Sequence, residues 1–176
     1  MNHLRLLFVL AFVAGCASSP FPPLTTAAAV DLNRFAGDWY VIASIPTFLE
    51  KNAYNAIESY EPPVNGRIKT TFRFNEGGLD GEEKRFYPTG FVDESEESNA
   101  FWRMQFVWPF KAEYRIVYVS EDYELTVIGR SKRDYVWIMA RTPAVPEHSY
   151  QSLVNIVRRE GYDLTALRKV PHVKPD

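Results

Sequence analysis

Residues 67–74 read Arg-Ile-Lys-Thr-Thr-Phe-Arg-Phe, with charged and apolar side chains in alternation. Successive side chains of a β-strand point to opposite faces, so Ile68, Thr70, Phe72 and Phe74 share one face. The opposite face carries three cations, which predicts a strand between a core and water. The preceding Asn65-Gly66 pair suits a tight hairpin turn, so this strand pairs back onto residues 54–61.

The same alternation recurs along the chain. In residues 99–107, Trp102, Met104 and Phe106 oppose Arg103 and Gln105; residues 112–119 repeat the pattern. Four more strands are expected, at residues 38–45, 82–92, 124–129 and 134–140. Together these segments predict an all-β domain, an eight-stranded antiparallel up-and-down barrel, and eight strands can enclose one small ligand.

Three of these strands, around residues 39–45, 125–129 and 135–140, are apolar on both faces and need an outer cover. An amphipathic helix is expected from Glu147 to Glu160, after Pro146 and before Gly161. Its apolar stripe is Tyr150, Leu153, Val154 and Val157. We expect this C-terminal helix to pack outside the barrel, with a short edge strand at residues 167–170.

The N-terminus has the pattern of a secretory signal. His3 and Arg5 precede the apolar residues 6–13, a run too short to span a bilayer. Residues 13–16, Val-Ala-Gly-Cys, resemble the lipobox of bacterial lipoproteins, which implies a lipidated Cys16 as membrane anchor. An ordinary signal peptide cleaved near Ala14 or Ala17 is the alternative. Alanine rather than aspartate after Cys16 favours the outer membrane.

These observations divide the chain into four parts. We expect a signal peptide at residues 1–15, a lipid-anchored tether at 16–30, the barrel with its helix at 31–172, and a tail at 173–176. The Pro-rich tether would be extended and about 40 Å long at ~3 Å per residue.

Three separated motifs resemble the lipocalin family, and the bacterial outer-membrane lipoprotein lipocalins in particular. Residues 37–43, Gly-Asp-Trp-Tyr-Val-Ile-Ala, resemble the Gly-x-Trp signature of the first strand. Residues 120–123 resemble the Thr-Asp-Tyr turn with Glu121 in place of threonine, and residues 139–143 supply an arginine after the last strand. The resemblance covers residues 31–169.

The resemblance implies that Gly37, Trp39, Asp122, Tyr123 and Arg141 close one end of the barrel. Arg141 would lie over the Trp39 indole, a contact of about 1–2 kcal/mol when desolvated. The alternative is that Trp39 is an unrelated core aromatic and Arg141 a surface cation.

The inward faces of the expected strands define the candidate ligand site. The interior residues are Phe72, Phe74, Phe86, Trp102, Met104, Phe106, Tyr114, Ile116 and Tyr118, and the mouth residues are Phe48, Trp108 and Phe110. So aromatic an interior suits an acyl chain, since each buried methylene is worth roughly 0.8 kcal/mol. Side chains that fill the barrel solidly are the alternative. Arg130, Lys132 and Arg133 form either a cationic rim for a head group or a solvated turn.

Glu58 breaks the apolar pattern, because its parity places a carboxylate inside the barrel. We expect it to pair with a ligand group or with a tyrosine hydroxyl such as that of Tyr114. Whether Glu58 and Trp137 face inward is left open by the sequence.

The residues that other function classes require are missing from the expected site. A net charge of −2 disfavours nucleic acid, and the histidines at positions 3, 148 and 172 lie away from the barrel-lining strands. A transmembrane barrel is excluded because one face of several strands carries Arg and Lys, each costing about 2–4 kcal/mol at mid-bilayer. We therefore expect no enzyme activity, no cofactor and no metal site; the acidic residues 93–97 read as a solvated turn.

The function expected is to bind and carry or store a fatty acid or lysophospholipid at the bacterial outer membrane, on its periplasmic face. A structural envelope lipoprotein with a filled barrel and protein partners is the alternative. Association into a homodimer stays open.

Overall fold

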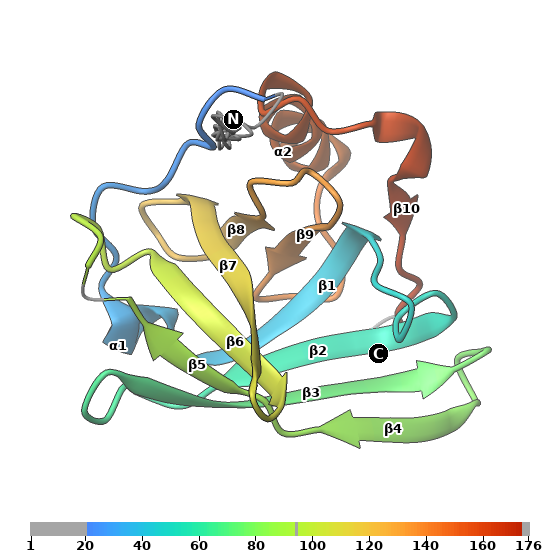
Figure 1. Cartoon of the computed structure of the whole chain (residues 1–176). Helices are drawn as coiled ribbons and strands as arrows, with labels where there is room; N and C mark the ends of the chain where they lie inside the picture. Colours follow the sequence, from blue (N-terminus) through green and yellow to red (C-terminus); the bar gives the residue numbers. More distant parts are fainter. Residues whose placement is uncertain (1–20, 94, 174–176) are drawn as a thin grey trace, which may run out of the picture.

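The computed structural model describes residues 21–93 and 95–173 (Figure 1). The expected signal peptide, Cys16 and residues 174–176 of the tail lie outside this range. The strands are β1 (Gly37–Ile45), β2 (Ala53–Tyr60), β3 (Arg67–Glu76), β4 (Glu82–Phe86), β5 (Thr89–Val92), β6 (Phe101–Val107), β7 (Phe110–Val119), β8 (Leu125–Gly129), β9 (Val136–Ala140) and β10 (Arg168–Lys169). The helices are α1 (Leu32–Phe35), α2 (Glu147–Arg159) and a 3₁₀ turn (Leu164–Ala166).

The strands form a closed antiparallel barrel. From β1 to β3 and from β5 to β9 each strand pairs with the next, β9 returns to β1, where Ile45 faces Val136, and the short β10 also pairs with β1. Both β4 and β5 pair with β3, so they are two halves of one strand interrupted at Tyr87-Pro88. Proline has no N–H to donate to a ladder, which explains the break. Counting β4 and β5 as one, and leaving out the two-residue β10 that pairs with β1, gives eight barrel strands, and the predicted barrel with one C-terminal helix is confirmed.

The barrel has an inner and an outer apolar core. The outer core lies between α2 and the strands β1, β8 and β9, where Leu153 and Val157 of the helix join Ile42, Val127 and Ile138. Figure 1 shows α2 lying across this side of the barrel. The helix therefore covers the strands that are apolar on both faces, as the sequence predicts. None of the helices in the described ranges is long and apolar enough to cross a bilayer.

A β-bulge in β7 changes which side chains face inward. The pairing with β8 shifts register between Ile116 and Tyr118. Ile116 belongs to the inner core, whereas Val117 and Tyr118 pack with the outer one. The prediction that Tyr118 lines the interior is therefore wrong, because one extra residue in the strand reverses the alternation.

Arg141 closes one end of the barrel. Its guanidinium lies 3.9 Å from the centre of the Trp39 ring. It donates hydrogen bonds to five backbone carbonyls, those of Arg34, Phe35, Ala36, Asp38 and Tyr123, at 2.7–3.2 Å. This end therefore has a charged plug, and each of the three guanidinium nitrogens donates to at least one backbone carbonyl.

The turn before β8 and the start of β1 support this closed end. The Tyr123 hydroxyl accepts a hydrogen bond from the Asp31 amide at 2.7 Å, and Asp122 accepts one from the Ser120 hydroxyl at 2.5 Å. Gly37 has a φ of +103°, and a Cβ there would lie 3.3 Å from Arg141 Nη1. Glycine is needed at this position because other residues strain at such a φ.

Residues 21–30 run along the outside of the barrel, from the neighbourhood of α2 down to α1 (Figure 1). The Ala27 amide donates to the Ile116 carbonyl at 2.9 Å, and Asn99 exchanges two hydrogen bonds with the Val30 backbone. Leu24 and Val30 are buried. An extended tether across 16–30 is therefore wrong for residues 21–30, because their backbone groups and apolar side chains find partners on the barrel.

Replacing Arg141 by alanine should destabilise the protein by about 3–4 kcal/mol. The change removes a desolvated cation–π contact of about 1–2 kcal/mol and charge-assisted hydrogen bonds of about 1.5–3 kcal/mol. Thermal unfolding followed by circular dichroism should show a Tm lower by roughly 10 °C.

Arg85→Ala is the matched control. The Arg85 side chain is half exposed and pairs with Glu83 on the surface, so its loss should cost less than about 1 kcal/mol. Equal Tm values for the two variants would show that Arg141 does not hold the closed end together.

Candidate ligand-binding site

A cavity of about 240 Å³ lies inside the barrel at the end opposite Arg141. It is bounded by the loop between β1 and β2, the loop between β8 and β9, and the inner faces of the strands. The lining residues are Thr47, Phe48, Leu49, Glu50, Glu58, Thr70, Phe72, Pro88, Met104, Phe106, Ala112, Tyr114, Arg130, Tyr135 and Trp137. The exposed Phe48, Phe106 and Ala112 mark its mouth.

The closed half of the barrel is filled by aromatic rings. Phe35 and Trp39 have ring centres 4.9 Å apart, and Trp102 stacks on Tyr114 at 5.2 Å. Trp39 and Trp102 have no exposed surface. The barrel is thus packed in its closed half and hollow in its open half.

Six of the residues expected at the site line the cavity. They are Phe48, Glu58, Phe72, Met104, Phe106 and Tyr114. Phe74 and Phe86 form a second layer, with ring centres 5.2 and 6.3 Å from that of Phe72. Trp102 and Ile116 point inward but belong to the packed inner core rather than to the cavity wall. The prediction that Trp102 and Ile116 contact the ligand is therefore wrong. The alternation of a strand shows which side chains point inward, but not how deep in the barrel they lie.

The expectation that Trp108 and Phe110 rim the cavity is also wrong. These side chains are 80% and 76% exposed and lie at the tip of the β6–β7 hairpin. The hairpin extends past the last wall residues, Phe106 and Ala112, so its tip lies beyond the rim.

Several wall residues could not be read from the sequence. Trp137 faces inward, and its indole N–H donates to Glu50 Oε1 at 3.0 Å. The other oxygen of Glu50 accepts from the Thr47 amide at 2.9 Å. Trp137 lies in a strand that is apolar on both faces, so alternation gave no signal, and Glu50 lies in a loop.

Glu58 faces inward and is 6% exposed. The Tyr60 hydroxyl donates a hydrogen bond to it, and the Tyr60 and Tyr114 hydroxyls are also hydrogen-bonded to each other. Tyr114 is thus linked to Glu58 through Tyr60 rather than directly.

The pKa of Glu58 is raised to about 7, chiefly by burial; the Tyr60 hydrogen bond opposes this rise, and the negative charge of Glu50 adds a smaller increase. Burial likewise raises the pKa of Tyr60 and of Tyr114 well above 10. Near neutral pH, Glu58 is therefore divided between a neutral acid that can donate a hydrogen bond and a carboxylate.

Arg130 brings a positive charge to the mouth. Its guanidinium lies 3.4 Å from Asp134 Oδ2 and 5.1 Å from the Tyr135 ring centre. Arg130 Nε and Asp134 Oδ1 are buried without a hydrogen-bond partner among the described residues. The Arg130 Nε donor suits an anionic group, whereas the Asp134 oxygen suits a hydrogen-bond donor.

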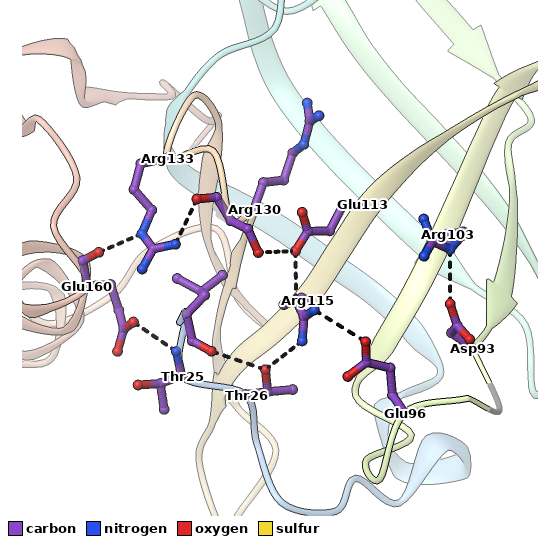
Figure 2. Close-up of polar contacts among 12 residues, drawn as sticks. Thr25, Thr26, Asp93, Glu96, Arg103, Glu113, Arg115, Arg130, Arg133 and Glu160 are labelled. Atoms are coloured by element: carbon purple, nitrogen blue, oxygen red, sulfur yellow. Dashed lines mark hydrogen bonds and ion pairs between the residues drawn. The ribbon is translucent and has the colours of Figure 1, made fainter. Parts of the chain in front are cut away.

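The other cations of this loop point elsewhere. Figure 2 shows Arg133 leaving the loop in a different direction from Arg130, toward the backbone of Glu160, to which it donates at 2.7 Å. Lys132 is exposed. The expected cationic rim is therefore reduced to Arg130 at the cavity.

Within residues 21–93 and 95–173, no cluster of three or more His, Cys, Asp or Glu side chains is arranged to hold a metal ion.

Sequence comparison identifies relatives for this barrel. A family model described as a lipocalin-like domain matches residues 30–172. The chain is 31% identical to temperature-induced lipocalin-1 of Arabidopsis thaliana over 149 residues, covering 81% of this chain and 79% of the relative. It is 26% identical over 160 residues to the outer membrane lipoprotein Blc of Escherichia coli, covering 88% of each chain.

Structure comparison gives the same fold. Lobster apocrustacyanin A1 superposes with a TM-score of 0.66 at 12% identity, covering 82% of this chain and 81% of that one. Insecticyanin from the tobacco hornworm Manduca sexta gives a TM-score of 0.63 at 12% identity, covering 85% of both.

Glu58→Gln should change the pH dependence of stability in a defined direction. In the unfolded chain the carboxyl loses its proton near the ordinary value of 4.5, whereas the folded protein keeps it up to about pH 7. Between these values the folded state binds more protons, so stability falls as pH rises. From pH 4.5 to 7, the free energy of unfolding should fall by roughly 3 kcal/mol relative to that of the variant.

Urea denaturation at several pH values from 4.5 to 8 measures this difference. Glu61→Gln, which alters an exposed carboxylate just after the same strand, should give a profile parallel to that of the parent protein. If the Glu58→Gln profile is parallel too, the carboxyl is not held neutral by its surroundings.

Proposed function

We propose that the barrel binds and carries or stores a fatty acid or lysophospholipid at the bacterial envelope. The premise is that this chain belongs to the lipocalin family, whose members bind small hydrophobic ligands. The observation that carries the proposal is the apolar cavity in the open half of an otherwise packed barrel.

The size of the cavity favours one acyl chain. Its 240 Å³ is below the range of about 300–1,000 Å³ that is common for drug-sized ligands. A single chain fits such a space better than the two chains of a diacyl lipid. Each methylene that leaves water is worth roughly 0.8 kcal/mol. Contact with the apolar side chains of Phe72, Met104 and Trp137 would therefore stabilise a bound acyl chain.

The charges in the cavity favour entry of the lipid with the methyl end of its acyl chain first. Glu58 and Glu50 lie inside and would repel a carboxylate or phosphate that reached them. Arg130 lies at the mouth with a donor to spare. We therefore place the head group of the ligand beside Arg130 and the methyl end toward Met104.

The proposed role is non-catalytic. The family consists in general of binding proteins, and the two described histidines do not face the cavity. His148 lies on α2, and His172 is hydrogen-bonded to the Val41 carbonyl on the outside of β1. Neither is within reach of a ligand in the barrel to act as a general base.

The proposed location is the periplasmic face of the outer membrane, with Cys16 lipidated as anchor. The names of the bacterial relatives support this location, since both the Escherichia coli and the Citrobacter freundii proteins are called outer membrane lipoproteins.

Ala112→Trp should block ligand binding without unfolding the protein. Ala112 lines the cavity, yet it is exposed, so an indole can be placed there without displacing buried side chains. Isothermal titration of the delipidated full chain with palmitate and with palmitoyl-lysophosphatidylcholine should give affinities at least about tenfold weaker than the parent's, a loss of about 1.4 kcal/mol.

Ala144→Trp provides the matched control, because Ala144 is an exposed alanine in the segment after Arg141, away from the cavity. It should bind both lipids as the parent does. If the parent itself binds neither lipid, the carrier function is rejected and the structural lipoprotein remains.

A further inference from the structure

The tip of the β6–β7 hairpin exposes a set of large apolar side chains to solvent. Val107, Trp108 and Phe110, here called the hairpin tip, are 67%, 80% and 76% exposed. Phe48, in the loop between β1 and β2, is 75% exposed. Monomeric proteins rarely leave so many aromatic rings in water at one end unless something covers them.

The hairpin tip is continuous with the cavity. Phe106 and Ala112, which flank it on β6 and β7, both line the cavity wall, and so does Phe48. Whatever covers the hairpin tip therefore lies against the mouth through which a ligand enters.

The start of the described chain is fixed at this same end of the barrel. Figure 2 shows the contacts: the Glu160 carboxylate accepts from the Thr25 amide at 3.0 Å, and Arg115 donates to the Thr26 hydroxyl at 3.3 Å. Arg133, in the loop between β8 and β9, donates to the Pro22 carbonyl at 2.8 Å. This loop borders the cavity at Arg130, so the chain leaves the barrel beside the open end.

The position of Phe21 limits where a lipid on Cys16 can be. Phe21 is five positions after Cys16, and a fully extended chain spans at most about 3.6 Å per position, or about 18 Å. A membrane that holds an acylated Cys16 would therefore lie within about 18 Å of Phe21. Since Arg133, which holds Pro22, belongs to a loop at the open end, an anchor at Cys16 leaves the open end within reach of that membrane.

We propose that the hairpin tip docks on a phospholipid bilayer and places the mouth of the cavity against the lipid. Tryptophan and phenylalanine are favoured at the boundary between head groups and acyl chains. Lys51 and Lys132 are exposed in the two loops beside the mouth and can contact anionic head groups. The acidic side chains of these loops are held on the protein, Glu50 by the Trp137 indole and Asp134 through its Oδ2 by Arg130. The docking does not depend on which molecule the cavity holds.

The test uses the fluorescence of Trp108 in the lipid-anchored full chain. The protein is reconstituted into phosphatidylcholine–phosphatidylglycerol vesicles whose acyl chains carry bromine, which quenches tryptophan on contact. The other three tryptophans are buried, and Trp108→Phe gives their contribution. Quenching of the Trp108 component should be several-fold stronger than that of the background, and quenching equal to the background would overturn the proposal.

A matched pair of variants shows whether the hairpin tip causes the contact. Val107 and Val64 have the same exposure, 67%, but Val64 lies in the turn between β2 and β3 at the closed end. Val107→Glu should lower the quenching of Trp108 several-fold, because a charge at the tip opposes insertion, whereas Val64→Glu should leave it unchanged. Equal effects of the two variants would count against docking.

Two further measurements separate this proposal from its rivals. Val107→Glu should bind palmitoyl-lysophosphatidylcholine in solution as the parent does, so a failure of docking is distinguishable from a failure of the carrier function. Sedimentation of the delipidated protein tests whether a second copy covers the tip instead. A dimer that Val107→Glu dissociates, together with background quenching, would overturn docking on a bilayer.

Discussion

The guanidinium of Arg141 is the interaction on which the arrangement of this barrel depends. It joins the segment before β1, the turn before β8 and the end of β9 through five carbonyl acceptors, while its flat face covers Trp39. Carbonyls at the end of a sheet closed on itself need such donors, and that of Phe35 also accepts from the Trp39 indole N–H at 2.8 Å. Because one end is sealed by a charge and filled with rings, the empty space is confined to the other end.

The polar groups of the cavity are consistent with this division. Glu58, Tyr60 and Tyr114 form a hydrogen-bonded set at the boundary between the packed and hollow halves. A carboxyl buried this deeply is tolerated because it is largely neutral up to about pH 7 and because a hydroxyl donates to it. In its ionised form the same group repels a second anion in the interior, so one residue bears on both the stability of the fold and the proposed way in which an acyl ligand enters.

The sequence predicted the barrel well because alternation with period two depends on local chemistry that the sequence displays directly. The strand at residues 67–74, the helix and the motif around Trp39 and Arg141 all lie where the residues indicated. The errors occur where alternation fails or gives no information. The bulge in β7 turned Tyr118 outward, and no residue type marks a bulge there.

Depth along the barrel axis was the second quantity missing from the sequence. Trp102 and Phe106 share a strand face, yet one is fully buried and the other is 47% exposed at the mouth. The period of a strand determines which side of the sheet a side chain faces. How far the packed half extends along the barrel axis depends on Phe35, Trp39 and Trp102, which come from three separate elements. The two ends of the barrel thus differ in chemistry as well as in packing. The closed end carries the charged Arg141, which is compatible with contact to water. The open end exposes Trp108 and Phe110, whose rings favour an apolar surface. Arg133, in a loop at the open end, and Glu160 hold the segment at Pro22 and Thr25. The proposed docking on a bilayer rests on this difference between the two ends, more than on the barrel itself.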